Sequence, residues 1–231
     1  MSNERKFDSE NPNILAAYQA ETEGKYLEAI EHYKKALAED PELGIVYKHI
    51  GNIYYRLGKI LDAIEYLKKA TEKLPQFPTA HYELALAIYR QGRFKQAAEV
   101  MQKVLELDEN FLLAHYWLGI INYHRGNLRK AKEHYLEVIR RSPDFTIAYF
   151  HLGVTNLRLG FYEEAVENFT VLTERNPESP AAYALKGDAL LNLDRKFEAR
   201  ESYRKALEFD PDDVKAKNGL AMLGDYKDVN F

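Results

Sequence analysis

The chain has 231 residues, a formal net charge of −4 and no cysteine. The lack of cysteine excludes disulfide bonds, thiolate metal ligands and a cysteine nucleophile, and the slightly acidic balance gives no bulk attraction to nucleic acid. The first residues are polar, without the apolar core of a signal peptide, and no apolar run approaches the length of a membrane span. These features favour a cytoplasmic protein with no membrane partner, and we expect residues 1–9 to be a flexible segment.

Small residues recur along the chain at a fixed interval of 34 residues. The most regular series is Ala29, Ala63, Ala97, Ala131, Ala165 and Ala199. A turn series reads Gly24, Gly58, Gly92, Gly126 and Gly160, with Asp194 in the sixth place. A third series reads Ala17, Gly51, Ala85, Gly119, Gly153, Gly187 and Ala221. A fixed period of this length is typical of one small structural unit copied along the chain.

Between these markers each copy has the pattern of two helices. In the second copy an apolar stripe with helical spacing begins at Val46, and Gly58 ends it. A second amphipathic stripe then runs from Asp62 to Leu74, and Pro75 prevents its continuation. The same pair of stripes is predicted for every copy.

A glycine inside the first helix indicates a steric requirement. Gly51 lies in the helix interior, where glycine costs about 1 kcal/mol relative to alanine. Two helices that cross at about 8–10 Å leave no room for a larger side chain at the crossing point. We therefore expect Gly51 and Ala63 to meet there, with Tyr54 and Leu67 beside them.

The combined pattern resembles the tetratricopeptide repeat, most clearly in the sixth copy. That copy carries Tyr183, Gly187, Leu190, Ala199, Tyr203, Ala206 and Pro211. The resemblance implies an all-α fold, an α-solenoid in which antiparallel helix pairs form a right-handed superhelix without strands. In this register the copies are 10–43, 44–77, 78–111, 112–145, 146–179 and 180–213, followed by a capping helix at 214–224 and a tail at 225–231. The resemblance does not specify one function, because this family has many.

The sequence shows no arrangement of residues that is typical of an enzyme. Acidic pairs such as Glu163 and Glu164 lie among lysines and arginines on second helices, as on a solvated helix face. Ser142 and Ser179 lie in turns between copies, where serine commonly caps a helix. The glycines follow the repeat and form no phosphate-binding cluster. We expect no catalytic activity and no cofactor.

The histidines are candidate metal ligands. His81 and His115 are one copy apart in the same register, so they could approach each other. No helix carries histidines and carboxylates at ligand spacing in several copies, and packed or hydrogen-bonded histidines are the ordinary case. We expect no metal site.

The resemblance implies that the first helices line a concave face. Positions 4, 7, 8 and 11 of each copy are expected to face the core, and positions 2, 5, 9, 12 and 13 to form an adjoining exposed stripe. In copies two to five this stripe is mainly aromatic and aliphatic, with one basic residue at position 13 of each copy. The predicted peptide-binding residues are Lys48, Asn52, Tyr55, Arg56, Tyr82, Leu86, Tyr89, Arg90, Tyr116, Ile120, Tyr123, His124, Phe150, Val154 and Arg158.

Two interpretations of this stripe stay open. Exposed apolar surface of such extent usually marks a partner site, and tyrosine and arginine are enriched at binding hot spots. Alternatively, the tyrosines pack on each other and the arginines lie over their rings. A carboxylate clamp known in the family is matched only by Lys48 and Asn52, because Glu83, Leu113 and Trp117 replace its other residues.

The sequence therefore predicts a non-enzymatic adaptor that holds a segment of a partner protein in a groove across copies two to five. The expected ligand has aromatic or aliphatic anchors with acidic residues between them. The alternative is a structural subunit that forms homo-oligomers through repeat ends, or through the tail at 226–231 entering the groove of a sister chain. A nucleic-acid partner is disfavoured by the charge.

Overall fold

The structure of the protein is a computed structural model that describes residues 11–225. The predicted flexible segment at 1–9 and the tail residues 226–231 lie outside the described residues. The alternative in which the tail enters a sister chain therefore stays a prediction.

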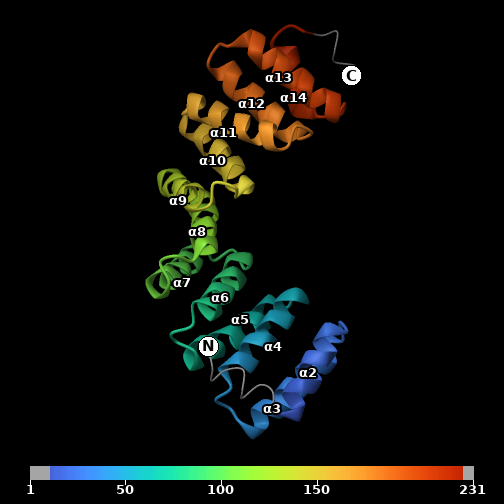
Figure 1. Ribbon diagram of the computed structural model, residues 1–231, viewed down its shortest axis with the longest axis vertical. Helices are drawn as coiled ribbons and strands as arrows, with labels where there is room; N and C mark the ends of the chain where they lie inside the picture. Colours follow the sequence, from blue (N-terminus) through green and yellow to red (C-terminus); the bar gives the residue numbers. More distant parts are fainter. Residues whose placement is uncertain (1–10, 226–231) are drawn as a thin grey trace. The chain divides into compact units, whose positions relative to one another are not determined.

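The described chain is built only from helices joined by short turns (Figure 1), so the all-α expectation is confirmed for residues 11–225. The helices are α2 Pro12–Thr22, α3 Tyr26–Glu39, α4 Gly44–Arg56, α5 Ile60–Lys73, α6 Pro78–Arg90, α7 Phe94–Leu107, α8 Leu112–His124, α9 Leu128–Arg141, α10 Thr146–Leu159, α11 Tyr162–Arg175, α12 Pro180–Asn192, α13 Lys196–Phe209 and α14 Val214–Met222. The even-numbered helices are the predicted first helices, and α14 is the predicted cap.

The chain divides into two compact units, residues 1–114 and 115–231, with the boundary inside α8. In unit 1, α2 packs on α3, α4 on α5 and α6 on α7. In unit 2, α10 packs on α9 and α11, and α12 packs on α11 and α13, while α14 covers α13. The first helices α4 and α6 in unit 1, and α10 and α12 in unit 2, are thus each held between two second helices of their own unit.

The turn glycines end the first helices by adopting a left-handed backbone. The five predicted turn glycines and Gly224 have φ between 74° and 81°. At Gly58 the turn is closed by the Lys59 amide, which donates to the Tyr54 carbonyl over 2.9 Å, as in a Schellman motif. Asp194 has φ 58° and is the one residue other than glycine with positive φ among those described. The predicted turns are confirmed, including the copy in which aspartate replaces glycine.

The first helices are buried on more positions than the sequence analysis expected. Position 3 is almost fully inaccessible in copies two to six and in the cap, although it was not assigned to the core. The residues there are Val46, Ala80, Ala114, Ala148, Ala182 and Ala216. Position 4, which was assigned to the core, is only half-buried at Tyr47 and Tyr149. The reason is that a helix packed between two neighbours buries two faces.

The glycine inside the first helix lies against a large side chain of the second helix, in unit 1 the Leu67 that was expected beside it. A Cβ atom built on Gly51 would lie 2.6 Å from Leu67 Cγ. In unit 2, a Cβ on Gly153 would lie 2.7 Å from Phe169 Cε1. Contacts this short are not tolerated, so the glycine makes space for the bulky residue at position 24 of its own copy.

We predict that Gly153→Ala lowers stability by roughly 1–3 kcal/mol, because the added methyl group overpacks the contact with Phe169. The third copy shows the compensating combination, since it carries Ala85 and Met101 at these positions and buries both fully. Gly153→Ala combined with Phe169→Met should recover part of the loss. Urea midpoints followed by circular dichroism test this, and an unchanged midpoint for Gly153→Ala would contradict it.

We also predict that Asp194→Gly raises stability by about 0.5–1 kcal/mol, because a left-handed backbone costs glycine less than other residues. The change removes the ion pair with Lys196, 3.0 Å long, but both side chains are largely exposed and such pairs contribute little. The reverse change, Gly160→Asp, should lower the urea midpoint. A loss of stability in Asp194→Gly would show that the aspartate has another role in the turn.

Candidate functional site

Two of the four basic residues at position 13 of the predicted stripe lie over tyrosines of the preceding copy. In unit 1, the Arg90 guanidinium carbon is 5.0 Å from the centre of the Tyr55 ring, and Arg90 Nη1 donates to the Tyr55 carbonyl over 3.0 Å. In unit 2, the Arg158 guanidinium carbon is 4.6 Å from the centre of the Tyr123 ring. The same contact between position 13 and the preceding position 12 thus forms in both units, as a cation–π interaction.

The other two basic residues of the stripe have different neighbours. Arg56 Nη1 lies 3.8 Å from Glu21 Oε1, because the first copy has glutamate where the next has Tyr55. The ring of His124 contacts the ring of Tyr123 edge-on, with centroids 5.8 Å apart. All four basic residues are nevertheless exposed. The packing interpretation is therefore correct for Arg90 and Arg158, whose side chains still present their outer faces to solvent.

The remaining predicted residues are half-buried rather than fully exposed. In unit 1 they are Lys48, Asn52, Tyr55, Tyr82, Leu86 and Tyr89, and in unit 2 Tyr116, Ile120, Tyr123, Phe150 and Val154. The expectation that position 5 is exposed was wrong at Ile14 and Ala184, which are inaccessible. The structure thus gathers two sets of partly accessible aromatic and aliphatic side chains, one in each unit.

The aromatic side chains at position 5 belong to ring clusters that fix their orientation. Tyr82 contacts Phe111 with ring centroids 5.2 Å apart. In unit 2, Tyr116 contacts Phe145 at 5.2 Å and His151 at 5.7 Å. Rings held in this way lose little further entropy when another molecule binds them.

Lys48 is engaged by a carboxylate of its own unit. Its Nζ lies 3.6 Å from Glu83 Oε1, on the next first helix. Burial raises the pKa of Glu83, and Lys48 opposes that rise by favouring the charged form. The residue that interrupts the carboxylate clamp therefore places its own carboxylate beside Lys48.

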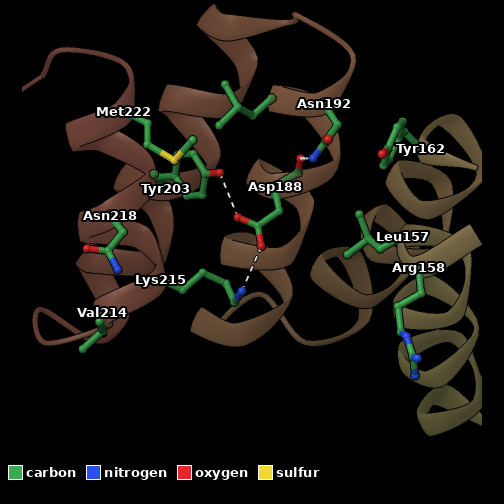
Figure 2. Close-up of a pocket in the computed structure, with 12 residues that line it drawn as sticks. Leu157, Arg158, Tyr162, Asp188, Asn192, Tyr203, Val214, Lys215, Asn218 and Met222 are labelled. Carbon is green, nitrogen blue, oxygen red and sulfur yellow. Dashed lines mark hydrogen bonds and ion pairs between the residues drawn. The ribbon is translucent and has the colours of Figure 1, made fainter. Parts of the chain in front are cut away.

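Unit 2 contains a pocket of about 750 Å³, and Arg158 is the one lining residue that was predicted from the sequence as a binding residue (Figure 2). It is formed by α10 to α14, at the C-terminal end of the helical array. The lining residues are Leu157, Arg158, Tyr162, Asp188, Leu191, Asn192, Tyr203, Val214, Lys215, Asn218, Gly219 and Met222.

Asp188 is held at the centre of this pocket by two donors, as Figure 2 shows. The Tyr203 hydroxyl donates to Oδ1 over 2.9 Å, and Lys215 Nζ donates to Oδ2 over 2.9 Å. Burial and the nearby Asp188 raise the pKa of Tyr203, so its hydroxyl remains protonated and a donor. The first copy has a similar arrangement, in which the Tyr33 hydroxyl donates to Glu21 Oε2 over 3.1 Å.

The ring of Tyr203 is enclosed by two glycines. A Cβ on Gly187 would lie 2.6 Å from its Cε1 atom, and a Cβ on Gly219 would lie 2.2 Å from its Cζ atom. Gly187 follows the repeat, but Gly219 stands where the preceding copy has Leu185. The signals for the pocket were therefore a glycine and an aspartate that break the pattern at the end of the array.

The histidines form no larger ligand group. His81 Nε2 lies 3.0 Å from the Pro75 carbonyl oxygen, and His115 Nδ1 lies 3.4 Å from His134 Nδ1. Among residues 11–225 no cluster of three or more histidine, aspartate or glutamate side chains has the geometry of a metal site. Burial, His115 and Lys130 together lower the pKa of His134 to about 4.

Models of the tetratricopeptide repeat match most of the chain. One matches residues 49–111 and 150–214, and two others match 22–58 and 89–153. The chain belongs to the tetratricopeptide repeat family. No curated protein matches it in sequence. None of the helices in residues 11–225 has the length and apolar character needed to cross a membrane.

Solved structures of this fold are similar over most of the chain. YrrB, described as a tetratricopeptide repeat protein with an unusual peptide-binding site, is 22% identical, with a TM-score of 0.74 over 82% of this chain and 97% of YrrB. MamA from Desulfovibrio magneticus RS-1 is 23% identical, with a TM-score of 0.70 over 74% of this chain and 97% of that one. The C-terminal part of a repeat protein from Cytophaga hutchinsonii is 21% identical, with a TM-score of 0.77 over 91% and 84%. These similarities establish the fold.

Family membership supports a general function as a scaffold for protein–protein interaction. Repeats of this family are typically interaction modules rather than catalytic domains.

The lowered pKa of His134 predicts that the stability of the fold depends on pH. The pKa of His134 lies near 4 in the folded chain and near 6.5 in the unfolded chain. The unfolded chain therefore takes up the proton first, and stability should fall as the pH drops from about 6.5 towards 4, by up to about 3 kcal/mol. Above pH 6.5 this histidine should contribute no pH dependence.

Urea midpoints measured between pH 4.5 and 7.5 test this. His134→Phe removes the titrating group and should flatten the curve, whereas the same replacement at the exposed His124 is the matched control. Equal curves for the wild type and His134→Phe would contradict the assignment.

Proposed function

We propose that the chain is a non-enzymatic scaffold that binds an extended segment of a partner protein on its first-helix faces. The proposed contacts in unit 1 centre on Tyr55, Tyr89 and Arg90, and those in unit 2 on Tyr123 and Arg158. The observation that carries the proposal is the arginine–tyrosine stack that forms at the same register in both units.

The stack supports binding because it holds the arginine side chain in one conformation before the ligand arrives. A free arginine loses about 2 kcal/mol of rotamer entropy when it is immobilised, and an arginine already lying on a ring loses less. Its planar guanidinium group can still donate two parallel hydrogen bonds to a carboxylate from its exposed edge. Two such groups, one in each unit, favour a ligand with acidic residues.

The half-buried side chains beside the stacks favour apolar anchors between those acidic residues. Leu86 and Tyr89 in unit 1, and Ile120 and Val154 in unit 2, each show part of their surface to solvent. A partner's aliphatic or aromatic side chain would bury that surface and gain about 25 cal/mol per Å² removed from water. The description of YrrB shows that this fold can hold a peptide.

We predict that Arg90→Ala and Arg158→Ala together weaken partner binding by several-fold and flatten its salt dependence, because two exposed cations are lost. Tyr123→Ala should chiefly raise the dissociation rate, because it removes buried contact area. The measurement is affinity capture with the wild type, followed by binding kinetics of each captured partner at low and high salt.

Arg125→Ala is the matched control, because Arg125 is exposed and immediately follows His124, the last residue of α8. It should bind like the wild type. If the double arginine variant keeps its helix content and binds every partner with unchanged affinity and salt dependence, the first-helix faces are not the binding surface.

A further inference from the structure

The pocket at the end of unit 2 combines an apolar wall with exposed cations. Its apolar members are Leu157, Leu191, Val214 and Met222, of which Val214 and Met222 are 69% and 77% exposed. Exposed apolar residues that cluster around a pocket indicate a binding surface, whereas scattered ones do not. The pocket volume lies within the range of natural ligand sites.

The charges that face solvent in the pocket are positive. Asp188 is the one carboxylate in the lining, and both of its oxygens already accept hydrogen bonds, from Tyr203 and Lys215. The Lys215 side chain remains 49% exposed, and Arg158 is exposed on the opposite wall. In Figure 2 Lys215 and Arg158 extend from different helices on either side of Leu157. The pocket is therefore complementary to a negatively charged group.

The position of Lys215 is fixed by groups that cannot move easily. Lys215 is bound by Asp188, Asp188 is bound by the Tyr203 hydroxyl, and the Tyr203 ring is enclosed by Gly187 and Gly219. This chain of contacts links an exposed ammonium group to the inaccessible core of unit 2. A charge positioned in advance in this way binds with a smaller entropy loss than a free surface lysine.

Polar side chains on the rim suit the backbone of an extended peptide. Asn218 is exposed on α14, and its amide can both donate and accept. Asn192 donates to the Asp188 carbonyl over 2.8 Å and presents its exposed side chain from α12. A peptide in extended conformation offers donors and acceptors in alternation that match these amides.

From these observations we infer that the pocket binds an extended internal segment of a partner protein, with an acidic side chain on Lys215 and an aliphatic or aromatic side chain against Leu157, Leu191 and Met222. This inference rests on the proposed peptide-binding function and specifies which kind of peptide segment binds in this pocket. Most of the lining comes from the successive first helices α10, α12 and α14, which at about 8–10 Å spacing span about 20 Å. An extended chain covers that length with about six residues.

The test is selection of random twelve-residue peptides, displayed without a free C-terminus, on the full chain. Selected peptides should carry an acidic residue within a few positions of an aliphatic or aromatic one. Their affinity should fall about tenfold or more for Lys215→Met, which removes the cation and leaves Asp188 to repel the ligand. Met222→Glu should cause a similar loss, because it places a negative charge on the apolar wall.

Lys217→Met is the matched control. Lys217 lies on the same helix and pairs with Asp212 over 3.1 Å, but it is not part of the pocket lining. It should change the affinity by less than twofold. Circular dichroism establishes that each variant keeps its fold before binding is compared.

The inference is overturned if no peptide is enriched, if the enriched peptides are basic, or if binding is unchanged in Lys215→Met. Binding that appears only when a free C-terminal carboxylate is supplied would also overturn it, because the proposed ligand is an internal segment. Peptides that lose affinity in the Arg90→Ala and Arg158→Ala variant but not in Lys215→Met would refute this pocket and leave the proposed function standing.

Discussion

The contact between a small first-helix residue and a bulky second-helix residue sets the geometry of each helix pair. Gly51 against Leu67 and Gly153 against Phe169 bring the two helices so close that a single methyl group would not fit. Protein interiors are packed densely, so such a contact allows little variation in how the helices cross. Because the same contact recurs at the same register, equivalent side chains of successive copies come to lie at similar distances within each unit.

This regularity explains why Arg90 lies over Tyr55 and Arg158 over Tyr123. The sequence of a single helix does not predict either contact, because the tyrosine ring belongs to the preceding copy, 35 residues earlier. The stack stabilises the array and also presents an ordered cation, so packing and binding do not exclude each other. A glycine also allows a close approach of helices at the end of unit 2. There Gly219 lets α14 pack directly against Tyr203, and Lys215 lies beside Asp188.

The period of 34 residues predicted the helices and turns because each depends on residues close in sequence. The turn at Gly58 is closed by residues next to it in the chain, and Asp194 was recognisable by its place in the series. Spacing shows where a small residue is required, as at Gly51, but not which side chain lies closest to it, which is Leu67. The pocket was missed because Asp188, Tyr203 and Lys215 come from three helices and converge only where the array ends.

The central claim is that partners contact the first helices, and site-specific photo-cross-linking tests it most directly. A photoreactive phenylalanine analogue is placed at Tyr123 on α8 in one variant and at Leu136 on α9 in another, where Leu136 is 46% exposed on the second helix of the same pair. The account predicts that partner proteins are captured from position 123 and not from position 136. Capture from position 136 alone would contradict it and would place the binding surface on the second helices.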